Sequence, residues 1–166
     1  MKLSPGTASL ILAAVSFATL AGAWAFEYAG YAPCELCLQE RIPYYAAVPG
    51  GLLAAFLAGR RPKLAAVILA ALALGFLYDA GLSIYHAGVE WRFWPGPETC
   101  TGDVVQATTS LSKSLQHNNV VRCDEAALRI FGLSLAGYNV LISAALAVLG
   151  GFAAVHALRS RLVKEG

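Results

Sequence analysis

Four cysteines and one arginine are the residues of this chain whose types and spacing could carry chemistry. Cys34 and Cys37 form a C-x-x-C pair, which can close a small disulfide ring, and Arg41 follows four residues later. If a helix begins here, its dipole and the arginine would both favour the thiolate of Cys37, which is the reactive form. Cys100 and Cys123 are a second pair, separated by a long loop. The two pairs together indicate reversible thiol–disulfide exchange.

Two other interpretations of the cysteines stay open at this point. A C-x-x-C pair can be half of a zinc site, but Cys100 and Cys123 do not have the close spacing of a second half, and no histidine cluster accompanies them. We therefore expect no metal. Both pairs could also be inert structural disulfides, and a Cys100–Cys123 bridge taken alone would favour that interpretation, because closing so long a loop would stabilise the fold by about 3 kcal/mol.

The elements that must position these cysteines are membrane-spanning helices. The chain has 166 residues, 58% of them hydrophobic and 13% charged, and the charges are confined to short segments. Apolar stretches long enough to cross a bilayer as helices occur at about 5–26, 42–59, 64–85 and 133–157. The first could instead be a cleaved signal peptide, although it is longer than the usual apolar core of one. We predict an all-α fold, a single four-span membrane domain over 1–166, with outer loops at about 27–41 and 86–132.

The basic residues orient the predicted bundle. The termini and the connection between the second and third spans hold 7 of the 12 lysines and arginines, and the opposite side holds 5 together with 9 of the 10 acids. The positive-inside rule then places both termini in the cytoplasm. Both cysteine pairs would lie on the outer, oxidising side, which again indicates disulfide chemistry.

Two ionisable residues fall within or beside the third span. Asp79 lies in its outer third and His86 at its outer end, about two helical turns later, so both side chains point roughly the same way. Ionisable residues in a membrane are candidates for function. For Asp79 we favour a plainer interpretation, contact with lipid headgroups or an arginine, whereas His86 could donate a hydrogen bond or pass a proton.

These residues resemble a known family. The run Cys34-Glu35-Leu36-Cys37-Leu38-Gln39-Glu40-Arg41 is similar to the C-x-L-C-x-x-x-R signature of the DsbB family of disulfide bond formation proteins. The segments around His86 and Cys100, and around Cys123 and Tyr138-Asn139, resemble the two ends of the second periplasmic loop of that family. The resemblance extends over nearly the whole chain, in order and with matching topology.

The resemblance implies a bacterial inner-membrane enzyme with periplasmic cysteine loops that oxidises the dithiol of a periplasmic DsbA-type partner. The partner would attack Cys100 and release Cys123, and electrons would pass to the Cys34–Cys37 disulfide, with Cys34 in the bridge between the loops. Cys37 would then face a membrane quinone, either ubiquinone or menaquinone, held by Arg41 and more weakly by His86. We expect contact with lipid and the quinone pool and no nucleic-acid partner.

Three other classes of protein share some of these features with a DsbB-type enzyme. A vitamin K epoxide reductase-like enzyme is disfavoured, because in that family the C-x-x-C follows the loop cysteines, whereas here it precedes them. A small transporter or channel has only Asp79 in its favour. A metal-binding membrane module that uses all four cysteines would be revealed by bound zinc. The sequence does not distinguish ubiquinone from menaquinone, or a general DsbA-type partner from a dedicated one.

Overall fold

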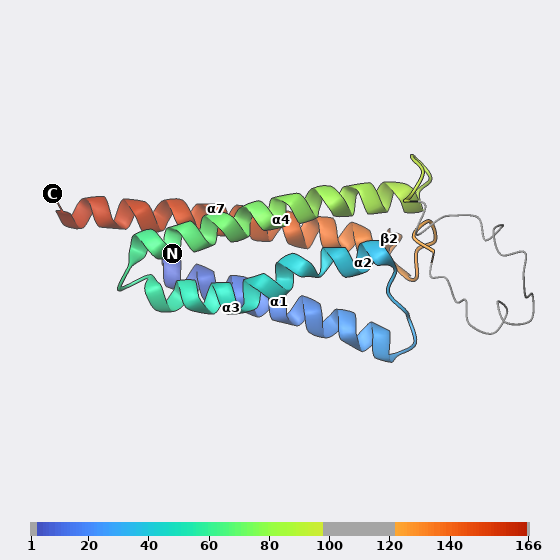
Figure 1. The fold of residues 1–166 in the computed structure, drawn as a ribbon, viewed down its shortest axis with the longest axis horizontal. Coiled ribbons are helices and arrows are strands. Elements are labelled where there is room, and N and C mark those ends of the chain that lie inside the picture. The colour runs from blue at the N-terminus through green and yellow to red at the C-terminus, as the bar shows by residue number, and fades with distance from the viewer. Residues whose placement is uncertain (1–2, 98–121, 166) are drawn as a thin grey trace, which may run out of the picture.

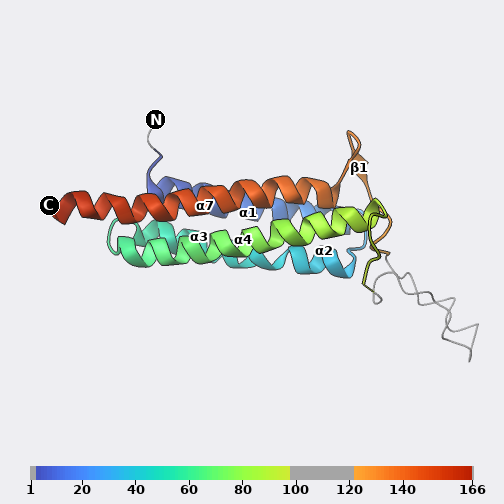
Figure 2. The same cartoon turned by 90° about the horizontal axis from the view of Figure 1, so that it is seen from above.

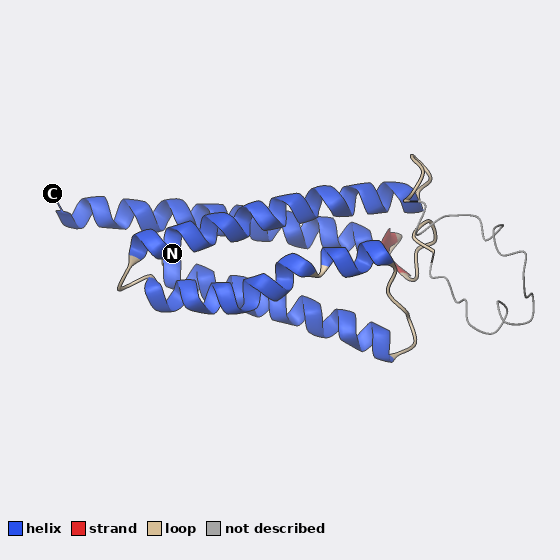
Figure 3. Cartoon of the chain, viewed as in Figure 1, coloured by secondary structure: helices blue, strands red, loops and turns tan. Residues whose placement is uncertain are grey.

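The structure, a computed structural model, describes residues 3–97 and 122–165. The predicted all-α class is confirmed, since helices make up almost all of the regular structure of this part of the chain (Figure 3). The elements are α1 (Pro5–Tyr28), α2 (Glu35–Glu40), α3 (Ile42–Leu57), α4 (Pro62–Glu90), the strands β1 (Arg129–Ile130) and β2 (Leu133–Ser134), and α7 (Leu135–Glu165).

The helices form an elongated bundle (Figures 1 and 2). Helices α4 and α7 make the most extensive contact, followed by α1 and α3. The N-terminus, the C-terminus and the turn between α3 and α4 lie toward one end of the bundle, on the left of Figure 1. The loop between α1 and α2, helix α2 and the β1–β2 hairpin lie at the opposite end, which we call the cysteine end.

The bundle is that of a membrane protein. Helices α1, α4 and the Leu135–Arg159 part of α7 are long and apolar enough to cross a membrane. Helix α3 is a fourth apolar helix of 16 residues, and α2 directly precedes it along the chain. Large apolar side chains such as Phe17, Leu74 and Val148 point outward from the bundle. In water such a surface would be unfavourable, whereas lipid accommodates it.

The second helical segment is divided, which the sequence analysis did not predict. The outer loop expected at 27–41 contains α2, and the chain turns at Arg41 before α3 begins. Pro43, in the first turn of α3, has no N–H to donate to the carbonyl group of Gln39. The helical hydrogen bonds are therefore interrupted between α2 and α3, and α2 is a separate short helix.

The loop expected at 86–132 also contains more regular structure than predicted. Helix α4 continues to Glu90, because no proline occurs between its first turn and the aromatic segment that follows it. Within that segment, Trp94 folds back onto α4 and its Nε1–H donates to the carbonyl oxygen of Tyr85 at 2.8 Å. Further along, β1 and β2 form a hairpin through Phe131 and Gly132, whose φ angles of 50° and 85° suit a tight two-residue turn.

Small residues let the helices approach closely in the half of the bundle nearest the termini. A Cβ atom at Gly51 of α3 would lie 2.9 Å from the carbonyl oxygen of Ser9 in α1. Only glycine therefore fits at this crossing without a backbone shift. The buried core around it is apolar and includes Leu12, Leu69 and Phe76.

Candidate functional site

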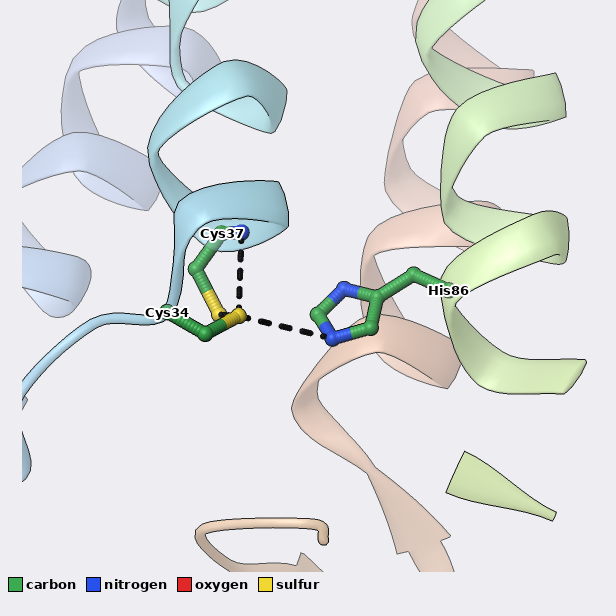
Figure 4. Close-up of side chains that lie close together, drawn as sticks. All are labelled: Cys34, Cys37 and His86. Carbon is green, nitrogen blue, oxygen red and sulfur yellow. Dashed lines mark hydrogen bonds between the residues drawn. The ribbon is translucent and has the colours of Figure 1, made fainter. Parts of the chain in front are cut away.

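The C-x-x-C pair lies at the start of α2. Cys34 is the N-cap residue of this helix, with extended backbone angles (φ −77°, ψ 171°), and its Sγ accepts the backbone N–H of Cys37 at 3.2 Å. Serine, threonine or aspartate usually supplies this cap, and here a sulfur does so. The helix therefore directs a backbone donor at the sulfur of Cys34 (Figure 4).

The two thiols interact directly. Both are free thiols, and their Sγ atoms lie 2.6 Å apart, so the pair is positioned to form a disulfide. The hydrogen bond between the two thiols, assisted by the backbone N–H of Cys37, lowers the pKa of Cys34 even though burial opposes the shift. The same bond between the thiols and burial raise the pKa of Cys37. Cys34 is therefore the more acidic thiol, whereas the sequence analysis assigned the favoured thiolate to Cys37.

Arg41 lies in the turn between α2 and α3. Its Nη1–H donates to Oε2 of Glu27, near the end of α1, at 2.8 Å. The sequence had led us to expect that Arg41 favours the thiolate of Cys37 from within one helix. The break in the helix and the ion pair with Glu27 instead tie the arginine to α1.

A cavity of about 280 Å³ opens beside the C-x-x-C pair. Cys37 and Arg41 contribute to its wall, together with Glu40. The remaining wall comes mainly from apolar and aromatic residues of α1, α3, α7 and the α1–α2 loop, including Leu20, Phe26, Tyr31, Tyr44, Tyr138 and Ile142. A mostly apolar cavity with a few converging polar groups is a typical site for a small organic ligand.

His86 reaches the C-x-x-C pair from α4. Its Nε2 lies 3.6 Å from Sγ of Cys34 (Figure 4). Its Nδ1 lies 2.8 Å from Oε1 of Glu40. The side chains of His86 and Glu40 are both buried. His86 is not among the residues that line the cavity, whereas Glu40 lines the cavity and contacts the histidine. The histidine is thus connected to the cavity through Glu40.

A buried hydrogen-bond network continues from Glu40 into the bundle. The side-chain amide of Asn139, on α7, lies 3.3 Å from Glu40 Oε2, 3.2 Å from Asp79 Oδ2 and 2.7 Å from Ser83 Oγ. Ser143 donates to Asp79 at 2.7 Å. Asp79 is fully buried, so the expectation that it contacts headgroups or an arginine is wrong. Its neighbours on α7 provide hydrogen-bond donors that a single-helix analysis could not identify.

Sequence reasoning missed Glu40 and Asn139 as members of this network. One signal was present, because Asp79, Ser83, His86 and Glu90 recur every three to four residues along α4 and therefore share one face. A polar stripe on an otherwise apolar helix requires polar partners. The sequence does not identify those partners, since they belong to other helices.

The second cysteine pair lies partly within the described residues. Cys123 is disulfide-bonded and buried, and it belongs to one cluster of buried side chains with Cys34, Leu36 and Val89. Cys100 lies outside the described residues. The structure therefore brings Cys123 to the first pair, although 89 and 86 residues of chain separate it from Cys34 and Cys37.

Cys34, Cys37 and His86 could also act as metal ligands. Their ligand atoms all lie within 4.8 Å of one another, and together they would supply three of the four ligands of a tetrahedral zinc site. The carboxylate of Glu40, next to Nδ1 of His86, would hold the imidazole in the orientation that such a site needs. Disulfide formation between the two cysteines would remove both sulfur ligands, so metal binding and redox chemistry are alternatives at this site.

The fold and site define a helical membrane protein with a buried, redox-capable thiol pair beside an apolar cavity. A family model described as "Disulfide bond formation protein DsbB" matches residues 5–153. The chain therefore belongs to the DsbB family and is a membrane disulfide oxidoreductase.

A curated protein from another organism is also similar to the chain. It is "Uncharacterized protein RP370" of Rickettsia prowazekii (strain Madrid E), 28% identical over 151 residues, which cover 86% of this chain and 84% of that protein. No solved structure matches the chain significantly.

Proposed function

We propose that this protein reoxidises a periplasmic DsbA-type dithiol and passes the electrons through Cys100/Cys123 and Cys34/Cys37 to a membrane quinone. The observation that carries the proposal is the position of Cys37, between its thiol partner Cys34 and the apolar cavity. One cysteine of the pair can thus exchange with a protein disulfide, while the other faces a site for a small acceptor.

The relay consists of thiol–disulfide exchanges. A partner thiolate attacks the Cys100–Cys123 disulfide at Cys100, and Cys123 leaves as a thiolate. The second partner thiol displaces Cys100, which yields the oxidised partner and a reduced Cys100/Cys123 pair. Cys123 then attacks Cys34, Cys37 leaves, and attack by Cys100 on Cys123 releases Cys34. Burial of Cys123 in one cluster with Cys34 supports the inter-loop step.

The cavity beside Cys37 fits a quinone ring. Its walls are largely aromatic and aliphatic, and Arg41 has five N–H donors, of which Nη1 bonds to Glu27. A bound quinone would supply an acceptor for two electrons and two protons. Arg41 would hold a ring oxygen, and Cys37 would present its sulfur. His86 stays a weaker candidate for direct contact, because it does not line the cavity and is connected to it through Glu40.

We further propose that the protein lies in the bacterial inner membrane with the cysteine end in the periplasm. Both termini and the basic α3–α4 turn, with Arg60 and Arg61, lie toward the opposite end of the bundle (Figure 1). That end would face the cytoplasm by the positive-inside rule. A thiol reagent that cannot cross membranes should then label the reduced cysteines of intact spheroplasts. Labelling only after the membrane is broken would contradict this orientation.

The proposal is tested by oxygen-free oxidation of reduced DsbA by the purified protein, with added ubiquinone or menaquinone. Wild-type protein should turn over with quinone, and Cys37→Ser should lose at least about a thousandfold in rate, since one of the two sulfurs is gone. Val148→Ala, on the outer face of α7, is the matched control and should keep full activity. No quinone-dependent turnover by folded wild-type protein with any periplasmic dithiol donor would contradict the proposal, and firmly bound zinc would then favour the metal site.

A further inference from the structure

Three buried side chains lie in a row from Cys34 to the cavity. His86 presents Nε2 to the sulfur of Cys34 at 3.6 Å and Nδ1 to Oε1 of Glu40 at 2.8 Å. Glu40 in turn lines the cavity that Cys37 and Arg41 also line. A carboxylate next to Nδ1 favours the tautomer with the proton on that nitrogen. The lone pair of Nε2 is then directed toward the thiol.

This order of groups is that of an activated nucleophile. A thiol becomes reactive when an adjacent base takes its proton and a third group orients the base. Here Cys34 is the N-cap residue of α2, the base is on α4, and the orienting carboxylate is on α2. The arrangement therefore depends on the packing of α2 against α4 and exists only in the folded protein.

We propose that His86 is the base that takes the thiol proton of Cys34, and that Glu40 orients the imidazole and conducts the proton to the cavity beside Cys37. The inference rests on the proposed function only for the fate of the proton. It assigns His86 to the thiol rather than to direct contact with the quinone, and it adds Glu40 as a positioning and proton-carrying residue.

The proton balance requires such a route. Oxidation of the Cys34/Cys37 dithiol forms one S–S bond, breaks two S–H bonds and releases two electrons and two protons. The acceptor, a membrane quinone, takes up both electrons and both protons and becomes a quinol. One proton leaves Cys34 through Nε2 of His86, passes from Nδ1 to Glu40 and reaches the cavity. The proton of Cys37 can follow the same route, because the two sulfurs are hydrogen-bonded to each other.

Other charged and titratable groups also face this row. On α4 itself, Oε1 of Glu90 lies 3.9 Å from Nε2 of His86. Asn139 of α7 connects Glu40 to Asp79, and the Tyr44 hydroxyl of α3 donates to Asn139 at 2.6 Å. Two carboxyl groups, those of Glu40 and Glu90, thus face one imidazole, an arrangement that favours an imidazolium once the thiol proton has transferred.

The test is a thiolate titration of the reduced full-length protein without quinone or partner, followed by ultraviolet absorbance. Cys100 and Cys123 are replaced by serine in every sample, so that only the C-x-x-C pair absorbs. His86→Gln should raise the midpoint of Cys34 ionisation by about 1–3 pH units, because the adjacent positive charge is lost. His156→Gln, the same change on α7 in the half of the bundle nearest the termini, should leave the midpoint unchanged. An unchanged midpoint in folded His86→Gln protein would overturn the proposal.

The role of Glu40 is tested by the infrared difference spectrum between the oxidised and reduced forms of the same protein. In Glu40→Gln the amide oxygen can still accept the N–H of His86, but it cannot take a proton. The carboxyl bands that change on reduction should disappear in this variant, while those of the imidazole persist. Identical carboxyl bands in the two proteins would show that Glu40 carries no proton. Neither measurement contains quinone, so a failure of the proposed function would leave both results standing.

Discussion

Helix α4 changes character along its length. From Pro62 to Phe76 it buries apolar side chains against the other helices, whereas from Asp79 to Glu90 the same face buries mostly polar ones. Both halves pack in the same bundle and both carry apolar residues on their outer face. The buried apolar residues of the first half are Ala65, Ala66, Leu69 and Phe76, and the buried polar residues of the second half are Asp79, Ser83, His86 and Glu90.

The difference separates packing from chemistry. Apolar side chains and small residues in the first half stabilise the bundle through close contact. Polar groups in the second half cost free energy to bury, and two of their oxygens, Oδ1 of Asp79 and Oε2 of Glu90, have no hydrogen-bond partner within the described residues. A membrane bundle gains little stability from such groups, so their presence points to function. Substitutions in the two halves should therefore affect different measurements.

The largest effect is expected at the cysteine end. Cys34→Ser should abolish turnover, a loss of at least about a thousandfold, because the sulfur that exchanges with Cys123 is gone. The serine hydroxyl can still accept the N–H of residue 37 and cap α2, so the stability should hardly change. Rates of DsbA oxidation and unfolding in detergent mixtures measure the two properties. A Cys34→Ser variant that loses stability as well as activity would contradict the separation of packing from chemistry.

The next effect concerns packing. Gly51→Leu should destabilise the bundle by about 1–3 kcal/mol or more, because the new side chain would collide with α1. Gly75→Leu is the matched control, since nothing lies within 4 Å of a Cβ atom at that position. Unfolding curves of both variants give the comparison. Equal stability of the two would contradict the close helix crossing at Gly51.

Asp79 marks the boundary between the halves, and its replacement should affect both properties. Asp79→Ala removes the acceptor of the bonds from Ser143 and Asn139, and each donor left unpaired costs about 1–3 kcal/mol. Asn139 also contacts Glu40, so an Asn139 side chain that has lost its bond to Asp79 should hold Glu40 less firmly and lower the activity. Asp79→Asn keeps an acceptor oxygen and should be milder in both assays. An alanine variant that matches wild type in both would remove Asp79 from the network.

The smallest effect is a difference in titration within the C-x-x-C pair. The pKa of Cys34 is lowered and that of Cys37 is raised, so raising the pH should ionise Cys34 first and leave Cys37 protonated well above the ordinary thiol range. Reduced protein with serine at positions 100 and 123 should therefore show the absorbance of one thiolate, and not two, near pH 9. Two thiolates that form together would contradict the hydrogen bond between the two thiols.

The hydropathy of the chain was sufficient to predict the class of fold. Four apolar stretches, separated by short charged segments, can only be helices in lipid, because each must satisfy its own backbone hydrogen bonds. The C-x-x-C spacing and the arginine that follows it, together with the four spans and the second cysteine pair, were sufficient to predict thiol chemistry and the family, and the match over residues 5–153 confirms the family.

Tertiary structure alone decided how the site is assembled. The sequence favoured the thiolate of Cys37, next to Arg41, but the N-cap at Cys34 and the hydrogen bond between the thiols favour that of Cys34. It indicated His86 as a candidate for function, but not the thiol and the carboxylate between which the imidazole lies. The physical reason is that spacing along one helix determines which side chains share a face, whereas the partner of each face depends on how separate helices pack.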